Sequence, residues 1–334
     1  MRTLMYNTKR YDRLTFEDCN GDHGHEIEYL DARLDTRTAD LADGFGAVCI
    51  FVNDDGGSET INRLAELGVS AIALRCAGYN NVDLEAAAAA GIAVVRVPAY
   101  SPEAVAEHTL ALILALDRHI HRAYQRVRDG NFALDGLLGS GLHGATAGVV
   151  GTGRIGHLVA RLLLAFGCDV LAHDPYVDEQ LVEAGVAYVN RSELLQRSDI
   201  IALTCPLTPE TFHLVNGAAV AEMKVGVMIV NTGRGALVET TAVIDGLKSG
   251  RIGALGLDVY EEEAPLFFED RSTEVITDDV FARLLTFPNV LLTAHQAFFT
   301  RPALQAIAAT TLSNLADLEA GRDCPNRVNL PAER

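Results

Sequence analysis

The apolar positions of the chain gather into short runs, separated by polar or helical stretches. In the first hundred residues the runs are 3–6, 47–52, 71–74 and 93–97. Helical spacing of apolar residues lies between them at 59–67 and 83–90, and each of these segments is followed by a glycine that can end a helix. Because strands alternate with helices in βα units, this pattern predicts a parallel sheet.

The same alternation continues through the second part of the chain. Further apolar runs occur at 147–150, 170–174, 186–189, 200–203, 227–230, 253–259 and 290–293. Several of them follow a segment with helical spacing. The pattern therefore predicts a second sheet of about seven strands in a doubly wound domain.

Two longer helical patterns stand apart from these units. The first, 102–121, can be capped by Ser101 and is apolar around much of its circumference, so we expect it to be buried between domains or between subunits. We interpret its histidines as packing or surface residues in preference to ligands. The second, 304–318, is amphipathic, and if it packs on the first domain the chain crosses between domains twice.

Length and charge limit the classes of function. The 334 residues suffice for two domains, and no run approaches the 18 apolar residues of a membrane span. The first residues lack the apolar core of a secretory signal, so we expect a cytoplasmic protein without a membrane partner. A net charge of −18 would repel a phosphate backbone, which makes nucleic acid an unsuitable partner.

The six cysteines lie far apart and form no C-x-x-C pair, so they signal neither a disulfide framework nor a zinc site. The densest group of possible metal ligands is 18–26, which contains two glycines. We interpret it as a polar surface loop and predict no metal site.

A glycine-rich motif after the first run of the second part carries the clearest chemistry. In AGVVGTGRIG, Gly151 can turn the chain sharply, Gly153 can let backbone approach a pyrophosphate, and Gly156 can let the helix pack on the strand. The next run ends in Asp174, 18 positions after the last glycine, close to the ~20 typical of a carboxylate that binds the adenine ribose. Such an acid would repel a 2′-phosphate, so the motif favours NAD.

Three further stretches follow predicted strands of this domain: NTGRG at 231–235, GLDVYEEEAP at 256–265 and LTAHQAFF at 292–299. Because parallel strands end at one edge, we expect Arg234, the acidic group that includes Glu263, and His295 to converge near the nicotinamide. Arginine can hold a carboxylate with two parallel bonds, and histidine titrates near neutrality. A neighbouring carboxylate would favour the imidazolium, so the set suits reduction of a 2-keto acid.

Over nearly the whole chain, the order GTGRIG, HDPY, CPLTPET, VNTGRG, GLDVYEEE and LTAHQAF resembles the D-isomer-specific 2-hydroxyacid dehydrogenase family. Within it, YNTKRYD, LRCAGYNNVD, VPAYSPEAVAEH and EAPLFFEDRS are most similar to the D-lactate dehydrogenase branch. The resemblance implies an α/β protein of two Rossmann-like or flavodoxin-like domains with parallel sheets. The substrate domain would be split, 1–100 plus 299–334, with an NAD-binding Rossmann domain, 101–298, inserted in it.

The resemblance also implies roles for individual residues. His295 would be the acid/base, Glu263 its partner in preference to Glu261 or Glu262, and Arg234 the ligand of the keto-acid carboxylate. On the substrate side, the residues implied are Ala77, Gly78, Tyr100 and Phe298, with Phe299 nearby. The cofactor residues implied, besides the glycines and Asp174, are Arg154, Ile155, Cys205, Pro206, Thr232 and Asp258. Cys76 departs from the asparagine of several relatives, with an effect on the carboxylate pocket that we leave open.

The sequence thus predicts an NAD-dependent enzyme that reduces pyruvate to D-lactate, with the two domains closing to exclude water. A related enzyme acting on larger keto acids such as phenylpyruvate or hydroxypyruvate is the alternative, because the sequence gives no pocket volume. A non-enzymatic, NAD-sensing scaffold is a more remote one. The apolar helix after Ser101 favours a homodimer or a tetramer of dimers.

Overall fold

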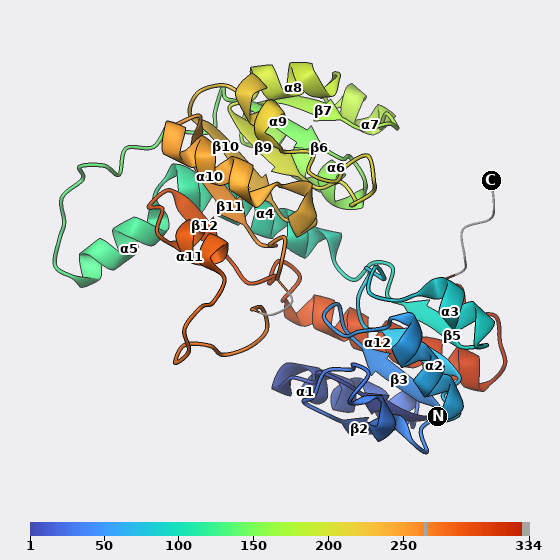
Figure 1. Ribbon diagram of the computed structural model, residues 1–334. Helices are drawn as coiled ribbons and strands as arrows, with labels where there is room; N and C mark the ends of the chain where they lie inside the picture. The colour runs from blue at the N-terminus through green and yellow to red at the C-terminus, as the bar shows by residue number, and fades with distance from the viewer. Residues whose placement is uncertain (264–265, 329–334) are drawn as a thin grey trace. The chain divides into compact units, whose positions relative to one another are not determined.

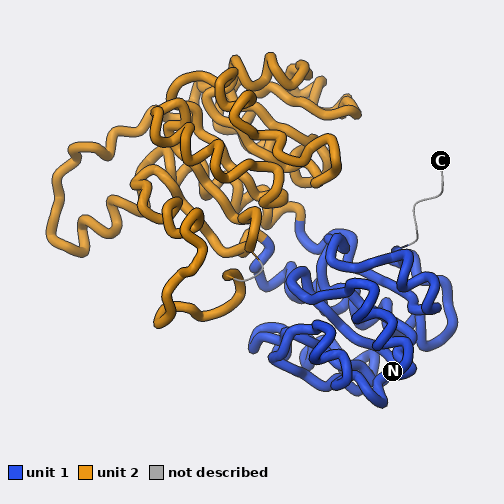
Figure 2. The backbone as a smooth tube through the Cα atoms, in the orientation of Figure 1, with its two compact units in different colours: residues 1–101, 298–334 blue, residues 102–297 orange. Residues whose placement is uncertain are grey.

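The computed structural model describes residues 1–263 and 266–328, which form two compact units (Figures 1 and 2). Unit 1 contains residues 1–101 together with the described residues from 298 onward, and unit 2 contains residues 102–297. Each unit has one sheet, and the pairings within both sheets are parallel. The predicted α/β class with parallel sheets is therefore confirmed.

Unit 1 has the strand order β2-β1-β3-β4-β5. This is the doubly wound order typical of flavodoxin-like domains. The strands are β1 (Arg2–Met5), β2 (Glu26–Tyr29), β3 (Ala47–Ile50), β4 (Ala71–Leu74) and β5 (Ala93–Arg96).

A C-terminal helix completes the core of unit 1. Thr300 caps α12 (Arg301–Glu319) by accepting the amide of Ala303, and the helix packs on β4, β5 and α1. Leu315 of this helix meets alanines of the sheet, whose small side chains let it approach closely. The helices of unit 1 are α1 (Arg10–Cys19), α2 (Ser58–Glu66), α3 (Leu84–Ala89) and α12, with short 3₁₀ turns η1 (Asn20–Asp22) and η2 (Ala39–Ala42).

Unit 2 has the strand order β12-β11-β10-β9-β6-β7-β8, so the predicted seven-stranded sheet is confirmed. The order reverses between β6 and β9, which is where open α/β sheets bind ligands. The strands are β6 (Thr146–Val150), β7 (Asp169–His173), β8 (Ala187–Tyr188), β9 (Ile200–Leu203), β10 (Val227–Asn231), β11 (Ile252–Leu257) and β12 (Val290–Leu292).

Alternate residues of this sheet enter two separate cores. Val149 and Ala202 face one core, whereas their neighbours Val150 and Leu203 face the other. The first core is covered by α4 (Pro102–Asp117), α6 (Arg154–Ala165) and α7 (Glu179–Glu183). The second is covered by α8 (Arg191–Arg197), α9 (Gly217–Glu222), α10 (Thr240–Ser249) and α11 (Asp279–Leu285), and the short turn η3 (Gly235–Leu237) adjoins it. Burial on both faces explains why these strands are apolar throughout.

The long helix predicted at 102–121 is wrong in its C-terminal end. It ends at Asp117, because His119 adopts a left-handed conformation with φ 50°, which an L-residue helix does not continue through. A second helix, α5 (Ile120–Arg128), starts there and buries no residue. Within unit 2, apolar residues of α4 pack on α6 and the sheet.

The segment 18–26 is more ordered than a surface loop. It spans the end of α1, the turn η1 and the first residue of β2. In the described part of the chain, no group of three or more histidine, cysteine, aspartate or glutamate side chains is arranged to hold a metal ion. Among the same residues, no helix is both long and apolar enough to cross a membrane.

Candidate active site

The glycine motif forms the turn between β6 and α6. Gly151 has φ 89°, and a Cβ there would lie 2.5 Å from the backbone of Cys205. A Cβ on Gly156 would overlap the carbonyl oxygen of Gly151. Gly153 is the N-cap of α6, and nothing lies within 4 Å of the position its Cβ would take. The turn is therefore tight where it packs and open where the helix N-terminus begins, which suits an anionic phosphate group.

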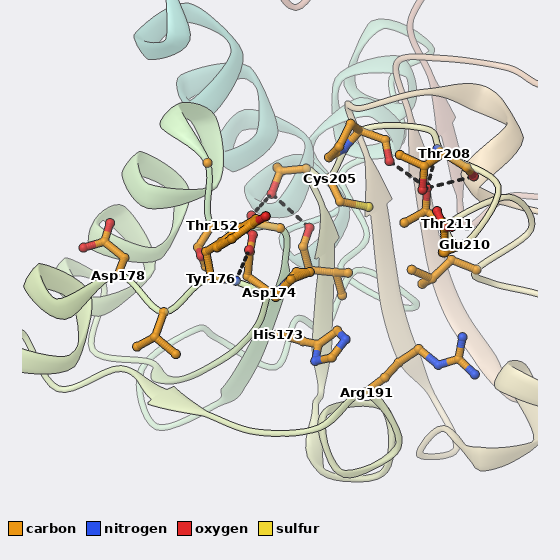
Figure 3. Close-up of a pocket in the computed structure, with 18 residues that line it drawn as sticks. Thr152, His173, Asp174, Tyr176, Asp178, Arg191, Cys205, Thr208, Glu210 and Thr211 are labelled. Atoms are coloured by element: carbon orange, nitrogen blue, oxygen red, sulfur yellow. Dashed lines mark hydrogen bonds between the residues drawn. The ribbon is translucent and has the colours of Figure 1, made fainter. Parts of the chain in front are cut away.

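A cavity of about 700 Å³ opens at the same edge of the sheet (Figure 3). It is formed by the loops after β6, β7 and β9 and so lies at the point where the strand order reverses. Five of the predicted cofactor residues line it: Gly151, Gly153, Asp174, Cys205 and Pro206. Burial raises the pKa of the Cys205 thiol to about 11, so this side chain stays uncharged and lines the cavity as a small apolar group.

The carboxylate of Asp174 is fixed by the backbone. Its Oδ2 accepts the amide of Thr152 at 2.7 Å and its Oδ1 accepts the amide of Tyr176 at 2.8 Å. His173 and Arg191 line the same cavity, and their side chains are seen beside it in Figure 3. Neither residue was predicted from the sequence to line the cofactor site, although His173 directly precedes the predicted ribose-binding acid.

Of the other predicted cofactor residues, Arg154 is exposed at the first turn of α6. It borders a separate hollow of about 490 Å³ together with His157 and Asp178. A hydrogen bond from His157 at 2.7 Å lowers the pKa of Asp178, which also caps α7. This pair links α6 to α7 beside the glycine turn. Ile155 follows in α6 and is half-buried against the core.

Three neighbouring strands of unit 2 carry the predicted catalytic side chains at their carboxyl ends. Arg234 follows β10, Glu263 lies in the loop after β11, and His295 follows β12. Because β10, β11 and β12 are adjacent and parallel, these loops emerge at one edge of the sheet.

His295 and Glu263 form a hydrogen-bonded pair. His295 Nδ1 lies 2.9 Å from Glu263 Oε1, and both side chains are mostly buried. The other oxygen, Glu263 Oε2, is buried and has no hydrogen-bond partner among the described residues. Glu261 is turned elsewhere, since it pairs with His213 at 2.5 Å and accepts the hydroxyl of Thr240 at 2.9 Å.

Asp258 anchors the loop that carries His295. Its carboxylate is fully buried and accepts the Thr293 hydroxyl at 2.5 Å and the amides of Gln296 and Ala297 at 2.9 Å each. Burial acts to raise the pKa of this carboxyl, but hydrogen bonds from His108 and these groups outweigh it, so the pKa is lowered. His108 Nε2 lies 3.1 Å from Thr293 Oγ1 and 3.4 Å from Asp258 Oδ1.

The turn that carries Arg234 is braced by Asn231. The side chain of Asn231 donates to the carbonyl of Arg234 at 2.9 Å and accepts the amide of Gly233 at 3.0 Å. Arg234 itself donates from Nη1 to the carbonyl of Gly233 at 2.8 Å. Thr232 is buried, with its hydroxyl 2.8 Å from that of Thr109 on α4.

In unit 1, the predicted substrate residues lie around the carboxyl ends of β4 and β5. Ala77 and Gly78 follow β4, and Tyr100 follows β5. The Phe298 ring lies 5.8 Å from that of Tyr100 and 6.2 Å from that of Phe51, which follows the neighbouring strand β3. Phe299 adds a further aromatic contact, 6.1 Å from Phe298. We call these rings the aromatic wall. Phe51 and Tyr100 follow β3 and β5, the two neighbours of the strand β4 that precedes Ala77 and Gly78.

Known proteins share both the sequence and the fold. Residues 110–297 match the family described as D-isomer specific 2-hydroxyacid dehydrogenase, NAD binding domain. D-lactate dehydrogenase of Escherichia coli strain K12 is 54% identical over 98% of this chain and 100% of its own. The chain belongs to the D-isomer-specific 2-hydroxyacid dehydrogenase family.

Two solved structures support the same assignment. The pyruvate reductase of Chlamydomonas reinhardtii is 44% identical with a TM-score of 0.92, covering 98% of each chain. D-lactate dehydrogenase from Aquifex aeolicus, complexed with NAD and lactic acid, is 33% identical with a TM-score of 0.88, covering 99% of this chain and 100% of its own. The protein is thus an NAD-dependent D-2-hydroxyacid dehydrogenase, and the non-enzymatic alternative is not supported.

The residues of this dehydrogenase fit the cofactor. The open position at Gly153, the N-terminus of α6 and the fixed carboxylate of Asp174 lie along one cavity edge, as a dinucleotide requires. His108 lies against Thr293 and Asp258, near the loop that carries His295, and this position was not predicted from the sequence. Its sequence signal is weak, because α4 contains other polar side chains such as Glu107 and Thr109.

Proposed function

We propose that this dehydrogenase reduces pyruvate to D-lactate with NADH. The observation that carries the proposal is the hydrogen-bonded His295–Glu263 pair at the strand edge of the NAD-binding unit. Its relatives in Escherichia coli and Chlamydomonas reinhardtii, described as D-lactate dehydrogenase and pyruvate reductase, support the choice of substrate.

In this proposal His295 transfers the proton. Glu263 accepts a hydrogen bond from the Nδ1–H of the imidazolium, which orients the ring and balances its charge. The opposite nitrogen, Nε2, then donates a proton to the substrate carbonyl oxygen, or removes one from the hydroxyl in the reverse direction. Bound NADH supplies the hydride that the carbonyl carbon receives.

The substrate carboxylate needs cationic and amide donors. Arg234 presents a guanidinium on a turn that Asn231 holds rigid, and it suits a carboxylate better than lysine because its donors form a planar fork. We also assign carboxylate binding to the backbone amides of Ala77 and Gly78.

The aromatic wall favours a small substrate. Tyr100, Phe51 and Phe299 all contact Phe298, so large rings already occupy the region proposed to face the methyl group. A bulky phenylpyruvate side chain would have to displace them, at a cost that pyruvate avoids.

We also propose a homodimer, and a reducing compartment such as the cytoplasm. The exposed segment that follows α4 supports the homodimer. The six cysteines are free thiols, five of them buried, which agrees with the second.

A keto-acid panel tests the function. The purified enzyme would be assayed for NADH oxidation with pyruvate, hydroxypyruvate and phenylpyruvate, and the product tested for D configuration. We expect kcat/KM to be highest with pyruvate, by about tenfold or more. A preference for either larger acid would replace pyruvate as the substrate.

Substitution of the proposed acid/base tests the mechanism. We expect His295→Gln to lower kcat by roughly 10²- to 10⁴-fold while NADH binding, followed by fluorescence, stays unchanged. Wild-type turnover in a folded His295→Gln protein would show that another group supplies the proton.

A further inference from the structure

The segment Cys76–Tyr79 uses every one of its carbonyl oxygens within the protein. The carbonyl of Cys76 accepts the amide of Val97 at 3.1 Å, and the carbonyl of Gly78 accepts the Cys76 thiol at 3.2 Å. The carbonyl of Tyr79 accepts an amide from the following turn at 3.1 Å. The carbonyl of Ala77 receives the one charged donor, Arg96 Nη1, at 2.7 Å.

The amides of this segment are left for another acceptor. In the described part of the chain, the N–H groups of Ala77, Gly78 and Tyr79 donate to no protein oxygen. Backbone amides without a protein acceptor are donors that an anion can use. This segment therefore has the chemistry to bind a carboxylate.

One peptide plane connects Arg96 to that site. The carbonyl of Ala77 and the amide of Gly78 belong to the same planar, trans peptide, in which C=O and N–H point in opposite directions. A donor that fixes the carbonyl on one side therefore fixes the direction of the amide on the other. Because the donor is a cation, it also polarises the peptide and strengthens the amide as a donor.

Arg96 is itself held in place. It is the last residue of β5, and its guanidinium lies over the ring of Tyr79, 5.0 Å from the centroid. Its backbone carbonyl accepts the side chain of Asn314 at 2.9 Å, and its amide donates to the carbonyl of Asn326 at 3.1 Å. The brace is thus built into the sheet and the C-terminal segment of unit 1.

We propose that Arg96 is a positioning residue for substrate: it orients and polarises the Ala77–Gly78 peptide so that the Gly78 amide binds the keto-acid carboxylate. The inference rests on the carboxylate role given to this segment under the proposed function. It concerns substrate affinity and not proton or hydride transfer.

The test is Arg96→Met, which keeps an unbranched side chain over Tyr79 and removes the charge and the donor. We expect KM for pyruvate to rise about tenfold, the size of one lost charged hydrogen bond, while kcat changes less than about threefold. The inhibition constant for oxamate, a substrate-like carboxylate, should rise by the same factor. KM for NADH should stay the same. We expect Arg96→Lys, which retains a cation and a donor, to give an intermediate KM.

Arg2→Met is the matched control. Arg2 also donates to a backbone carbonyl, that of Gly44 at 3.3 Å, and lies over an aromatic ring, but it is on β1. Its substitution should leave KM for pyruvate unchanged. An unchanged KM in Arg96→Met, or a loss of thermal stability and NADH affinity as large as the loss of pyruvate affinity, would overturn the inference. An inactive wild-type enzyme with pyruvate would instead count against the proposed function.

Discussion

Asp258 illustrates how one residue can serve a site without touching substrate. The resemblance implies that it is a cofactor residue, and that role stays a prediction. In the structure its oxygens accept hydrogen bonds from Thr293, Gln296 and Ala297, on both sides of His295. The amide of His295 also donates to the Asp258 carbonyl at 2.7 Å, and His295 has a left-handed φ of 51°. The acid therefore holds the strained loop that carries His295.

We expect Asp258→Asn to destabilise the protein in a pH-dependent way. The folded-state pKa of Asp258 lies below its unfolded value of about 3.9, so its stabilisation is fully present above that value and is lost as pH falls through the folded pKa. The difference in unfolding free energy from wild type should be about 2–4 kcal/mol between pH 5 and 7 and should shrink below pH ~4. Urea unfolding at each pH measures it.

Asp199→Asn is the control for that experiment. Asp199 also has a lowered pKa, with burial opposed by a hydrogen bond from Lys224, but its side chain is 45% exposed. Its substitution should cost much less, because solvent screens the pair. Equal losses for both variants, or a loss in Asp258→Asn that does not shrink as the pH falls below ~4, would contradict the anchoring role.

Single residues also show which parts of the candidate site could be predicted from the sequence and which could not. Arg234, Glu263 and His295 could be predicted to share one edge because each follows an apolar run, and parallel strands end together. His108 could not be placed in the same way. Its contact with Thr293 joins positions 185 residues apart and exists because α4 packs across β11 and β12. No local pattern encodes that register.

Among the elements, strands with two buried faces were predicted, whereas the edge strand β2 was missed. Every residue of β3 and β4 is buried, and the sequences of both strands are continuous apolar runs. β2 has the sequence EIEY, with its residues exposed or half-buried, so its apolar signal is weak. The break between α4 and α5 was also hidden, because a left-handed histidine carries no sequence signature as clear as glycine.

The turn from β6 to α6 is the element on which the cofactor site depends, and Gly156→Ala tests it. Because the new Cβ would overlap the Gly151 carbonyl, α6 must shift away from the strand. We expect the dissociation constant for NADH to rise at least tenfold, together with a fall in Tm of several degrees. Fluorescence titration and thermal unfolding measure the two effects.

Gly217→Ala provides the comparison for this turn. Gly217 is the first residue of α9, and nothing lies within 4 Å of the position of its Cβ. The substitution should leave NADH binding unchanged and stabilise the helix slightly. Normal NADH affinity in Gly156→Ala would show that the close packing of this turn is dispensable.

At the scale of the whole molecule, a single copy of the chain does not explain why one apolar segment is exposed. Residues 118–141, here called the arm, include α5 and the following loop, and Figure 1 shows them standing away from the sheet of unit 2. Phe132, Leu134 and Leu138 are 75%, 81% and 92% exposed. The arm also carries four arginines between 118 and 128, in a chain of net charge −18. An apolar, basic arm is complementary to the acidic surface of a second copy, which supports the proposed homodimer.

We therefore expect Leu134→Asp with Leu138→Asp to convert the dimer to a monomer, because two carboxylates cannot be buried in an apolar contact without a large cost. Light scattering coupled to gel filtration should give twice the mass of one chain for the wild type and the mass of one chain for the double variant. Val275→Asp is the control, since Val275 is 85% exposed but lies outside the arm. It should remain dimeric. A monomeric wild type would refute the homodimer, whereas a dimeric double variant would assign the contact to another surface.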